Sequence, residues 1–140
     1  MKLELEGRTE LACGALVALE AAGSERLPGR SLAERLDITP EYLTKIISPL
    51  ARAGWITSTT GPNGGYRLAI ELNTLCVLDL IEAVEGRIDR EKCMHGDSRN
   101  PALERCSLHE PWVRAREALL HELEETPLVL SGPSSPSKGE

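Results

Sequence analysis

The amino-acid sequence predicts a mainly α-helical domain with a small β-hairpin wing: a winged helix-turn-helix followed by a long C-terminal dimerisation helix. Three observations support this fold class. Apolar residues recur at helical spacing over most of the 140-residue chain. A short helix, a tight turn and an amphipathic helix follow one another between residues 31 and 53. Two β-prone runs then flank a glycine-rich turn at residues 61–65.

Length and composition predict one domain with an aliphatic core. The chain is 41% hydrophobic but contains only 2 Trp, 2 Tyr and no Phe. No run approaches the ~18 apolar residues that a membrane span requires, and the two acidic residues among the first six, Glu4 and Glu6, do not suit a signal peptide. We therefore expect a cytoplasmic protein without membrane association, in which the 4 cysteines stay reduced.

Two helices are expected first. An apolar stripe runs over Arg8–Ala22, and Gly23 is a natural C-terminal stop. A short helix is expected over Leu32–Leu36. Ser31 is a good N-cap for it, with Glu34 three residues later as the partner of a capping box.

The next helix is expected to begin after a tight turn. Thr39 suits the N-cap, and Pro40 suits the first helical position. The helix should run to about Ala53, where Gly54 ends it. Pro49 lies inside this helix and should bend its last turn, because proline cannot donate the backbone hydrogen bond.

A β-hairpin and a further helix follow. The β-prone run Trp55–Thr60, the turn Gly61–Gly65 and the run Tyr66–Ala69 predict two short paired strands. Thr74–Val84 is expected to be helical. Together, residues 1–86 are expected to form the winged-helix domain.

The C-terminal third divides into three parts. Residues 87–109 are polar and irregular, and we interpret them as a Cys/His sensor loop. Helical spacing resumes over Pro111–Glu125, so residues 110–126 form the expected dimerisation helix. Its apolar positions are Trp112, Ala115, Leu119 and Leu123. Residues 127–140 are rich in Pro, Gly and Ser and are expected to be disordered.

The charge distribution is uneven along the chain. The net charge of −6 at pH 7 is unfavourable for binding nucleic acid. Residues 30–69 nevertheless carry a net charge of +2, so the rest of the chain carries −8. Because local charge matters more than the sum, the helix-turn-helix and hairpin can still contact DNA.

The helix-turn-helix and the hairpin together indicate a DNA-binding surface. The second helix of such a motif enters the major groove, where Lys45 can reach a guanine edge or a phosphate and Thr44 a thymine methyl. Gly64 and Gly65 leave backbone N–H groups open to phosphate. Taken singly, the two tyrosines also suit ordinary packing. The expected DNA contacts are Thr39, Tyr42, Thr44, Lys45, Ser48, Arg52, Asn63, Gly64 and Arg67.

The run Gly61-Pro62-Asn63-Gly64-Gly65-Tyr66-Arg67-Leu68, preceded by Tyr42-Leu43 and Leu50-x-x-x-Gly54, resembles the Rrf-two family of winged-helix regulators, which includes IscR and NsrR. The resemblance covers roughly residues 1–128 and extends to Cys106-Ser107-Leu108-His109-x-x-Trp112. It implies a homodimer with crossing C-terminal helices and a palindromic double-stranded DNA operator. Thr60 stands where many members have a basic residue, so Arg67 or Arg52 is expected to carry more of the phosphate contact.

Two cysteines lie in the expected helices. Cys13 and Cys76 have apolar neighbours and are expected to be buried small hydrophobic residues. His121 is expected on a helix surface.

The other two cysteines lie in the polar segment. Cys93 and Cys106 are accompanied by His95 between them and His109 after them. Thiolate and imidazole ligands suit zinc or an iron–sulfur centre. The spacing Cys93-x12-Cys106-x2-His109 matches no standard zinc finger.

The resemblance implies an iron–sulfur cluster in this segment, commonly held by three cysteines. The middle cysteine is missing, since Asp and Ser occupy positions 97 and 98. The expected ligands are Cys93, Cys106 and His109, completed by His95 or by Glu10, at a position where some members supply an acidic ligand across the dimer. A [2Fe-2S] centre with mixed ligands suits redox or nitric-oxide sensing. Zinc or no metal are the alternatives.

The leading hypothesis is a homodimeric, sequence-specific DNA-binding transcriptional regulator that senses redox state, nitric oxide or iron–sulfur status through this cluster. The alternative is a cluster-free family member regulated by thiol oxidation or by a partner protein, which the acidic surface outside residues 30–69 could bind. An enzyme is not expected, because no nucleophile–base pair is evident and the 61–65 run lacks the Lys-Ser/Thr of a phosphate-binding loop.

Overall fold

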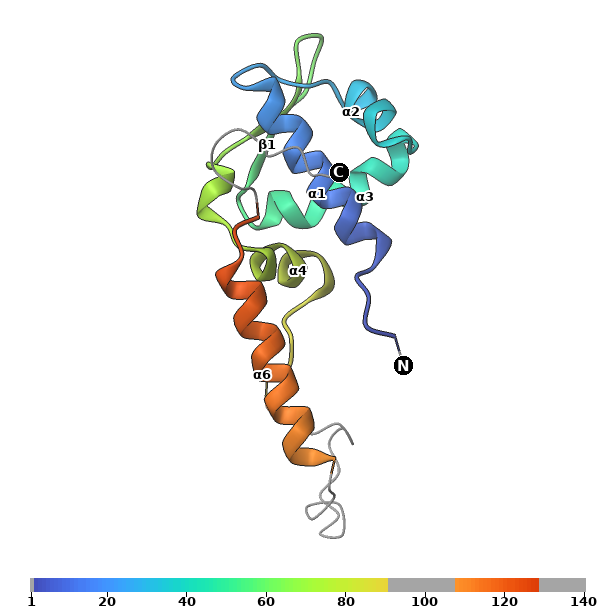
Figure 1. Cartoon of the computed structure of the whole chain (residues 1–140). Helices are drawn as coiled ribbons and strands as arrows, with labels where there is room; N and C mark the ends of the chain where they lie inside the picture. The colour runs from blue at the N-terminus through green and yellow to red at the C-terminus, as the bar shows by residue number, and fades with distance from the viewer. Residues whose placement is uncertain (1, 91–107, 129–140) are drawn as a thin grey trace, which may run out of the picture.

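The computed structural model describes residues 2–90 and 108–128. A body of short helices carries a β-hairpin at one end, and one long helix extends from the opposite end (Figure 1). The elements are α1 (Gly7–Ala22), α2 (Gly29–Leu36), α3 (Pro40–Arg52), β1 (Ile56–Thr59), β2 (Gly65–Leu68), the 3₁₀ helix η1 (Leu72–Thr74), α4 (Val77–Glu85) and α6 (His109–Glu125). The predicted fold class is confirmed. No helix in these two ranges is long and apolar enough to cross a membrane.

Helix α1 lies at the centre of the body. It packs against α2, α3 and α4, and β2 also touches it. Ala12, Ala15, Leu16 and Leu19 are buried, as the apolar stripe predicts. The helix ends where predicted, because Gly23 adopts φ 66°, a conformation that glycine tolerates without strain.

The packing of α2 on α3 confirms the predicted helix-turn-helix. Leu32, Leu43, Ile46 and Leu50 are each at most 1% exposed and belong to one core cluster with α1. Burial of such a side chain contributes roughly 1.5–3 kcal/mol. The apolar face of α3 is therefore fixed toward the body.

The start of α2 differs from the prediction. The helix begins at Gly29 with Pro28 at the N-cap position, and no side chain accepts a hydrogen bond there. Ser31 lies inside the helix, so its assignment as the N-cap of a capping box is wrong. The reason is tertiary: Leu27 pairs with Tyr66 of β2 through two backbone hydrogen bonds of 2.9 Å, and this pairing directs the chain into the helix earlier.

The turn between α2 and α3 has the predicted chemistry. Asp37 adopts the left-handed conformation with φ 56°. The Thr39 hydroxyl accepts a hydrogen bond of 3.1 Å from the backbone N–H of Tyr42, and Pro40 begins α3. Pro49 does not end the helix early, since Ala53 donates to the Pro49 carbonyl at 3.1 Å.

The hairpin is a two-stranded antiparallel sheet. Its register pairs Ile56 with Leu68 and Thr59 with Gly65. Ile56 is buried, whereas the other three residues of β1 are exposed. The wing therefore attaches to the core at its base and extends freely at its tip.

Helix α4 starts later than the predicted residue 74. A short 3₁₀ turn precedes it, and Cys76 takes the N-cap position. The backbone N–H of Cys76 donates to the Asp79 carboxylate at 2.9 Å. This capping interaction fixes the start of α4 at Val77.

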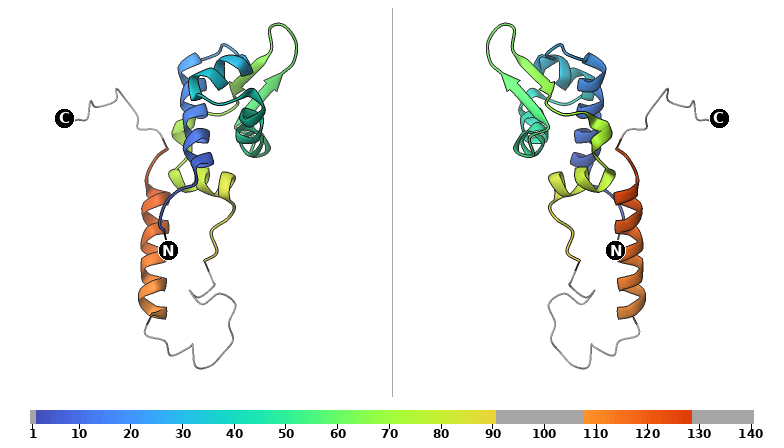
Figure 2. Two further views of the ribbon diagram at one scale, coloured as in Figure 1. Left: turned by 90° about the vertical axis from the view of Figure 1, so that its right-hand side faces the viewer. Right: turned by 90° about the vertical axis from the view of Figure 1, so that its left-hand side faces the viewer.

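Within the described residues, helix α6 packs on the body through its C-terminal half, and the Arg116 guanidinium in its middle donates to the Arg90 carbonyl at 2.7 Å. Leu120 is 4% exposed, and α4 is the element that α6 contacts most extensively. The backbone N–H of Val77 donates to the Thr126 carbonyl, and that of Leu128 donates to the Leu75 carbonyl, both at 2.9 Å. The N-terminal half of α6 projects away from the body (Figure 2).

The N-cap of α3 gives a stability prediction. Thr39→Ala should lower the free energy of unfolding by about 1 kcal/mol, because the N–H of Tyr42 loses its acceptor. Chemical denaturation measures this change. Thr44→Ala is the matched control, since the exposed Thr44 hydroxyl only donates to the Pro40 carbonyl within the helix and alanine has the higher helix propensity. Equal stability of both variants would contradict the capping role.

Candidate DNA-binding surface and sensor residues

The outer face of α3 presents most of the predicted DNA contacts. Lys45 and Ser48 are exposed in its middle and Arg52 at its end, while Thr39 and Thr44 are exposed in its first turns. Thr44 keeps its methyl group outward, since its hydroxyl donates to the Pro40 carbonyl at 3.3 Å. These short or flexible polar groups can follow base edges in a major groove.

Tyr42 departs from the predicted outward position. Its side chain is half-buried and packs against the core. An aromatic ring at this place on α3 covers apolar residues, and part of it stays exposed. Its packing role is therefore established, and its predicted DNA contact stays a prediction.

The tip of the wing contains the other predicted contacts. Asn63 and Arg67 are exposed. The backbone N–H of Gly64 donates to the Gly61 carbonyl at 2.9 Å, so the expectation that this N–H is open to phosphate is wrong. A Cβ at Gly64 would lie 2.2 Å from the Thr59 carbonyl oxygen. Glycine is required there by the tightness of the turn.

Glycine is also required at position 65 for a structural reason. It adopts φ 147°, and a Cβ there would lie 2.5 Å from the Leu27 carbonyl oxygen. The absence of a side chain lets the loop before α2 pair with β2. The second glycine thus ties the wing to the helix-turn-helix.

The cations of this region are solvent-exposed. They occur on α2, α3 and β2, and none of them forms a salt bridge within the part of the chain that the structure describes. They are Arg30, Arg35, Lys45, Arg52 and Arg67. Exposed, unpaired cations contact phosphates at low cost, since no internal ion pair has to break.

The predicted metal ligands lie mostly outside the described residues. Cys93, His95 and Cys106 belong to the segment 91–107. His109 begins α6 and is half-buried, whereas Glu10 is exposed in the first turn of α1. Figure 1 shows the start of α6 far from the body that contains α1. Within one chain, the described structure does not bring Glu10 and His109 together.

The described residues contain no group of three or more His, Cys, Asp or Glu that could hold a metal ion. Cys13 and Cys76 are half-buried rather than fully buried, which corrects the sequence prediction. Burial raises the pKa of both thiols. They are therefore protonated and weakly reactive near neutral pH.

One set of hydrogen bonds, around Glu85, was not predicted from the sequence. The Glu85 carboxylate at the end of α4 accepts hydrogen bonds from the backbone N–H of Glu6, at 3.1 Å, and from the hydroxyl of Thr9. Thr9 is 1% exposed. Arg8 pairs with Glu6, and this hydrogen bond raises the pKa of Arg8. Glu85 is separated from Glu6 by 79 positions and from Thr9 by 76. No local sequence signal could therefore reveal these contacts.

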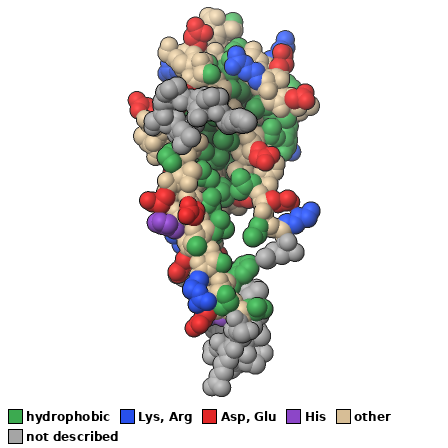
Figure 3. Space-filling view, viewed as in Figure 1, with side chains coloured by type: hydrophobic (Ala, Val, Ile, Leu, Met, Phe, Trp, Pro, Cys, Tyr) green, Lys and Arg blue, Asp and Glu red, His purple; other side chains and the backbone are tan. Residues whose placement is uncertain are grey.

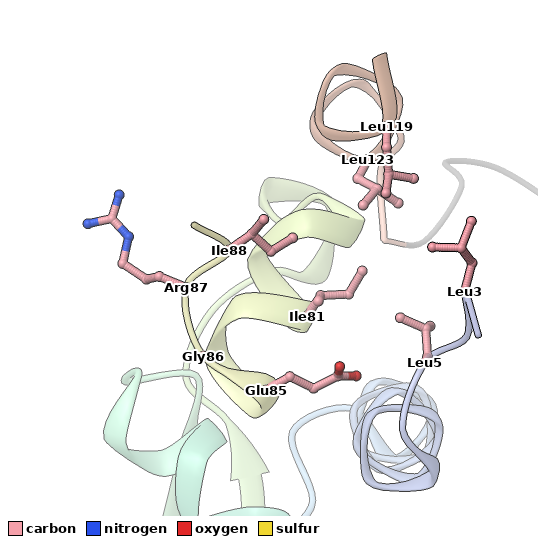
Figure 4. A pocket seen from close by; sticks show the side chains of 9 residues that line it. All are labelled: Leu3, Leu5, Ile81, Glu85, Gly86, Arg87, Ile88, Leu119 and Leu123. Atoms are coloured by element: carbon pink, nitrogen blue, oxygen red, sulfur yellow. The ribbon is translucent and has the colours of Figure 1, made fainter. Parts of the chain in front are cut away.

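An apolar groove of about 510 Å³ lies between the N-terminal segment, the end of α4 and α6. Its walls are Leu3, Leu5, Ile81, Glu85, Gly86, Arg87, Ile88, Leu119 and Leu123 (Figure 4). Hydrophobic side chains continue from the body along α6 in the space-filling view (Figure 3). Leu119 is 50% exposed here.

A winged helix-turn-helix with an appended long helix is the class that this architecture defines. The family model described as an iron-dependent transcriptional regulator, Rrf2, matches residues 5–129. The chain belongs to the Rrf2 family of transcriptional regulators, which confirms the family resemblance.

Individual relatives agree with this assignment. The chain is 37% identical over 112 residues to the HTH-type transcriptional regulator IscR of Vibrio atlanticus, covering 80% of this chain and 64% of that protein. It is 32% identical to Protein rrf2 of Nitratidesulfovibrio vulgaris, covering 86% and 81% respectively. The chain thus spans slightly less than two thirds of the IscR relative. These relatives are named as regulators or family members, as expected for a chain that is not an enzyme.

A solved structure is also similar. CymR, the global cysteine regulator of B. subtilis, superposes with a TM-score of 0.71 and 26% sequence identity, covering 91% of this chain and 94% of that one. The similarity extends over the body and α6 together. The arrangement of the winged helix and the long helix is therefore shared with this structure.

The raised thiol pKa values give a reactivity prediction. In a chain with Cys93→Ser and Cys106→Ser, Cys13 and Cys76 should react with maleimide more slowly than a free thiol at neutral pH and faster as pH rises. Because burial raises the pKa of these thiols in the folded state, the free energy of unfolding should fall as pH rises through the ordinary titration range of a thiol. Unfolded protein is the control. Labelling of the folded protein at the free-thiol rate would contradict the prediction.

Proposed function

We propose that the protein is a homodimeric regulator that binds a palindromic DNA operator through α3 and the wing. The supporting observation is the two-sided character of α3. Leu43, Ile46 and Leu50 hold one side in the core, while Lys45 and Ser48 stay exposed on the other. A helix fixed in this way can enter a major groove without reorganisation. Such a protein acts where the chromosome lies, in the cytoplasm.

The cations on the wing and at the end of α3 support the same proposal. Arg67 is exposed on β2, and Arg52 ends α3. Thr60, at the wing tip, is exposed and uncharged. Phosphate contacts are therefore assigned to Arg52 and Arg67, while the uncharged tip supplies shape and hydrogen bonds.

The homodimer is supported by the composition of α6. Trp112, Ala115, Leu119 and Leu123 share one side of the helix, next to the side that Leu120 packs on α4. If two such helices pair antiparallel and cross near their midpoints, Trp112 of one helix lies opposite Leu123 of the other. This contact is self-complementary, as a two-fold symmetric interface requires.

The charges along α6 favour the same antiparallel pairing. The first half contains Arg114 and Arg116 and one acid, Glu110, whereas residues 117–125 contain four glutamates and no Lys or Arg. Parallel pairing would set four acids against four. Antiparallel pairing sets the acidic half of one helix near the basic half of the other.

The cofactor proposal is a [2Fe-2S] cluster held by Cys93, Cys106 and His109, with Glu10 or His95 as the fourth ligand. Antiparallel pairing places the start of one α6 beside the end of the other, next to the body that carries α1. Glu10 of the partner subunit is then the nearer acidic candidate. When bound, such a cluster supplies one-electron redox chemistry, and the attached helix α6 can pass its state to the dimer.

The DNA proposal is tested on an operator selected from a random duplex library. Lys45→Ala should weaken operator binding by about 10- to 100-fold and relax the preference for the base pair that it faces. Arg67→Ala should weaken binding similarly on all sequences and lower the slope of log affinity against log salt by about 1 per subunit, because it contacts phosphate. Fluorescence anisotropy at two or more salt concentrations measures both effects.

Lys2→Ala is the control for these variants, since Lys2 is an exposed cation outside the proposed surface. Its affinity should match that of the unmodified protein. Unchanged operator affinity in the Lys45 and Arg67 variants, or failure to select any operator, would refute the proposed surface.

The cluster proposal is tested by anaerobic purification. The protein should absorb between about 400 and 480 nm, and Cys93→Ala or Cys106→Ala should remove the band. Cys13→Ala and Cys76→Ala are matched controls that should retain it. Colourless, iron-free protein that binds the operator fully would instead support a cluster-free regulator that responds to thiol oxidation or a partner protein.

A further inference from the structure

The N-terminal segment, residues 2–6, forms one wall of the apolar groove. Leu3 and Leu5 are two residues apart in an extended segment, so both point to the same side. Figure 4 shows them across the groove from Leu119 and Leu123. Leu3 is 82% exposed and Leu5 44%. The described residues therefore leave these apolar groups without a covering.

Glu85 fixes the position of this segment. Its Oε2 accepts from the backbone N–H of Glu6 and from the Thr9 hydroxyl. Both donors lie at the start of α1, so the segment is held beside the end of α4. The wall formed by Leu3 and Leu5 is thus tied to the end of α4.

We propose that the groove receives Trp112 of the partner subunit, and that Glu85 is the positioning residue for the wall that encloses it. This inference rests on the homodimer proposed above. In the antiparallel pairing, the partner's Trp112 lies opposite Leu123, which lines the groove. Trp112 is the largest side chain of α6 and is only half-buried in its own chain. The leucine and isoleucine walls suit its ring.

The polar end of the indole also finds an acceptor there. A buried tryptophan N–H requires a hydrogen-bond partner. The Glu85 carboxylate faces the groove (Figure 4), and no donor among the residues the structure describes binds its Oε1. One carboxylate oxygen then holds the wall, and the other accepts from the partner's indole.

The test follows Trp112 emission in the Trp55→Phe variant, which leaves Trp112 as the only tryptophan. The full-length protein is diluted through its dimer–monomer transition, and sedimentation records the oligomeric state in parallel. Trp112 emission should lie at shorter wavelength in the dimer and shift to longer wavelength on dissociation.

Leu3→Ser combined with Leu5→Ser should raise the dimer dissociation constant by about 10- to 100-fold, because two apolar side chains lose their buried contact. At equal dimer content, Trp112 emission should also shift to longer wavelength. Lys2→Ser combined with Glu4→Ser is the matched control on the other side of the same segment, and it should change neither quantity.

Glu85→Ala should produce the same shift, and Glu85→Gln, which keeps one carbonyl oxygen, should restore part of it. Unchanged dimerisation and emission in the Leu3/Leu5 and Glu85 variants would overturn the inference. The homodimer proposal has its own test, because Leu119→Asp with Leu123→Asp should yield monomers. If that variant stays dimeric, the antiparallel pairing and this inference both fail.

Discussion

The packing of α3 against α1 and α2 is the constraint on which the rest of the structure depends. With no phenylalanine in the chain, this contact is made by aliphatic side chains, and Leu16, Leu32, Leu43 and Leu50 are each at most 1% exposed. Their interlocking fixes the rotation of α3 about its own axis. The polar side chains on the opposite side of α3, including Lys45, are held outward as a consequence.

The same body supports a second, separate surface. Leu120 holds α6 to α4, and the backbone hydrogen bonds at Val77 and Leu128 fix its C-terminal end. The neighbouring stripe of α6 then faces the groove bordered by the N-terminal segment. Helix α1 contacts both α3 and α4, so one helix joins the proposed DNA-binding surface to the element that borders the groove. Coupling between the proposed subunit pairing and the proposed DNA binding would have a short path through this helix.

Local chemistry predicted the elements well, and long-range contacts account for the differences. Thr39 and Gly23 act as the sequence indicates, because capping depends on adjacent residues. Ser31 does not, because pairing of Leu27 with Tyr66 moves the start of α2. Glycine is required at position 64 by the closeness of the Thr59 carbonyl oxygen, a contact that the sequence pattern did not indicate. The Glu85 contacts join opposite ends of the domain, which no local pattern encodes, while Cys93, His95 and Cys106 lie outside the described residues.

The central claim, that two copies present their α3 helices side by side to duplex DNA, is tested most directly by a distance measurement. Spin labels at Ala51→Cys, an exposed α3 position outside the proposed DNA contacts, report the separation of the two α3 helices by pulsed electron paramagnetic resonance once the native cysteines are replaced. The account predicts one dominant distance near one turn of B-DNA, about 34 Å, that narrows in distribution on operator binding. Absence of any intermolecular distance, or one far from this spacing on the operator, would contradict it.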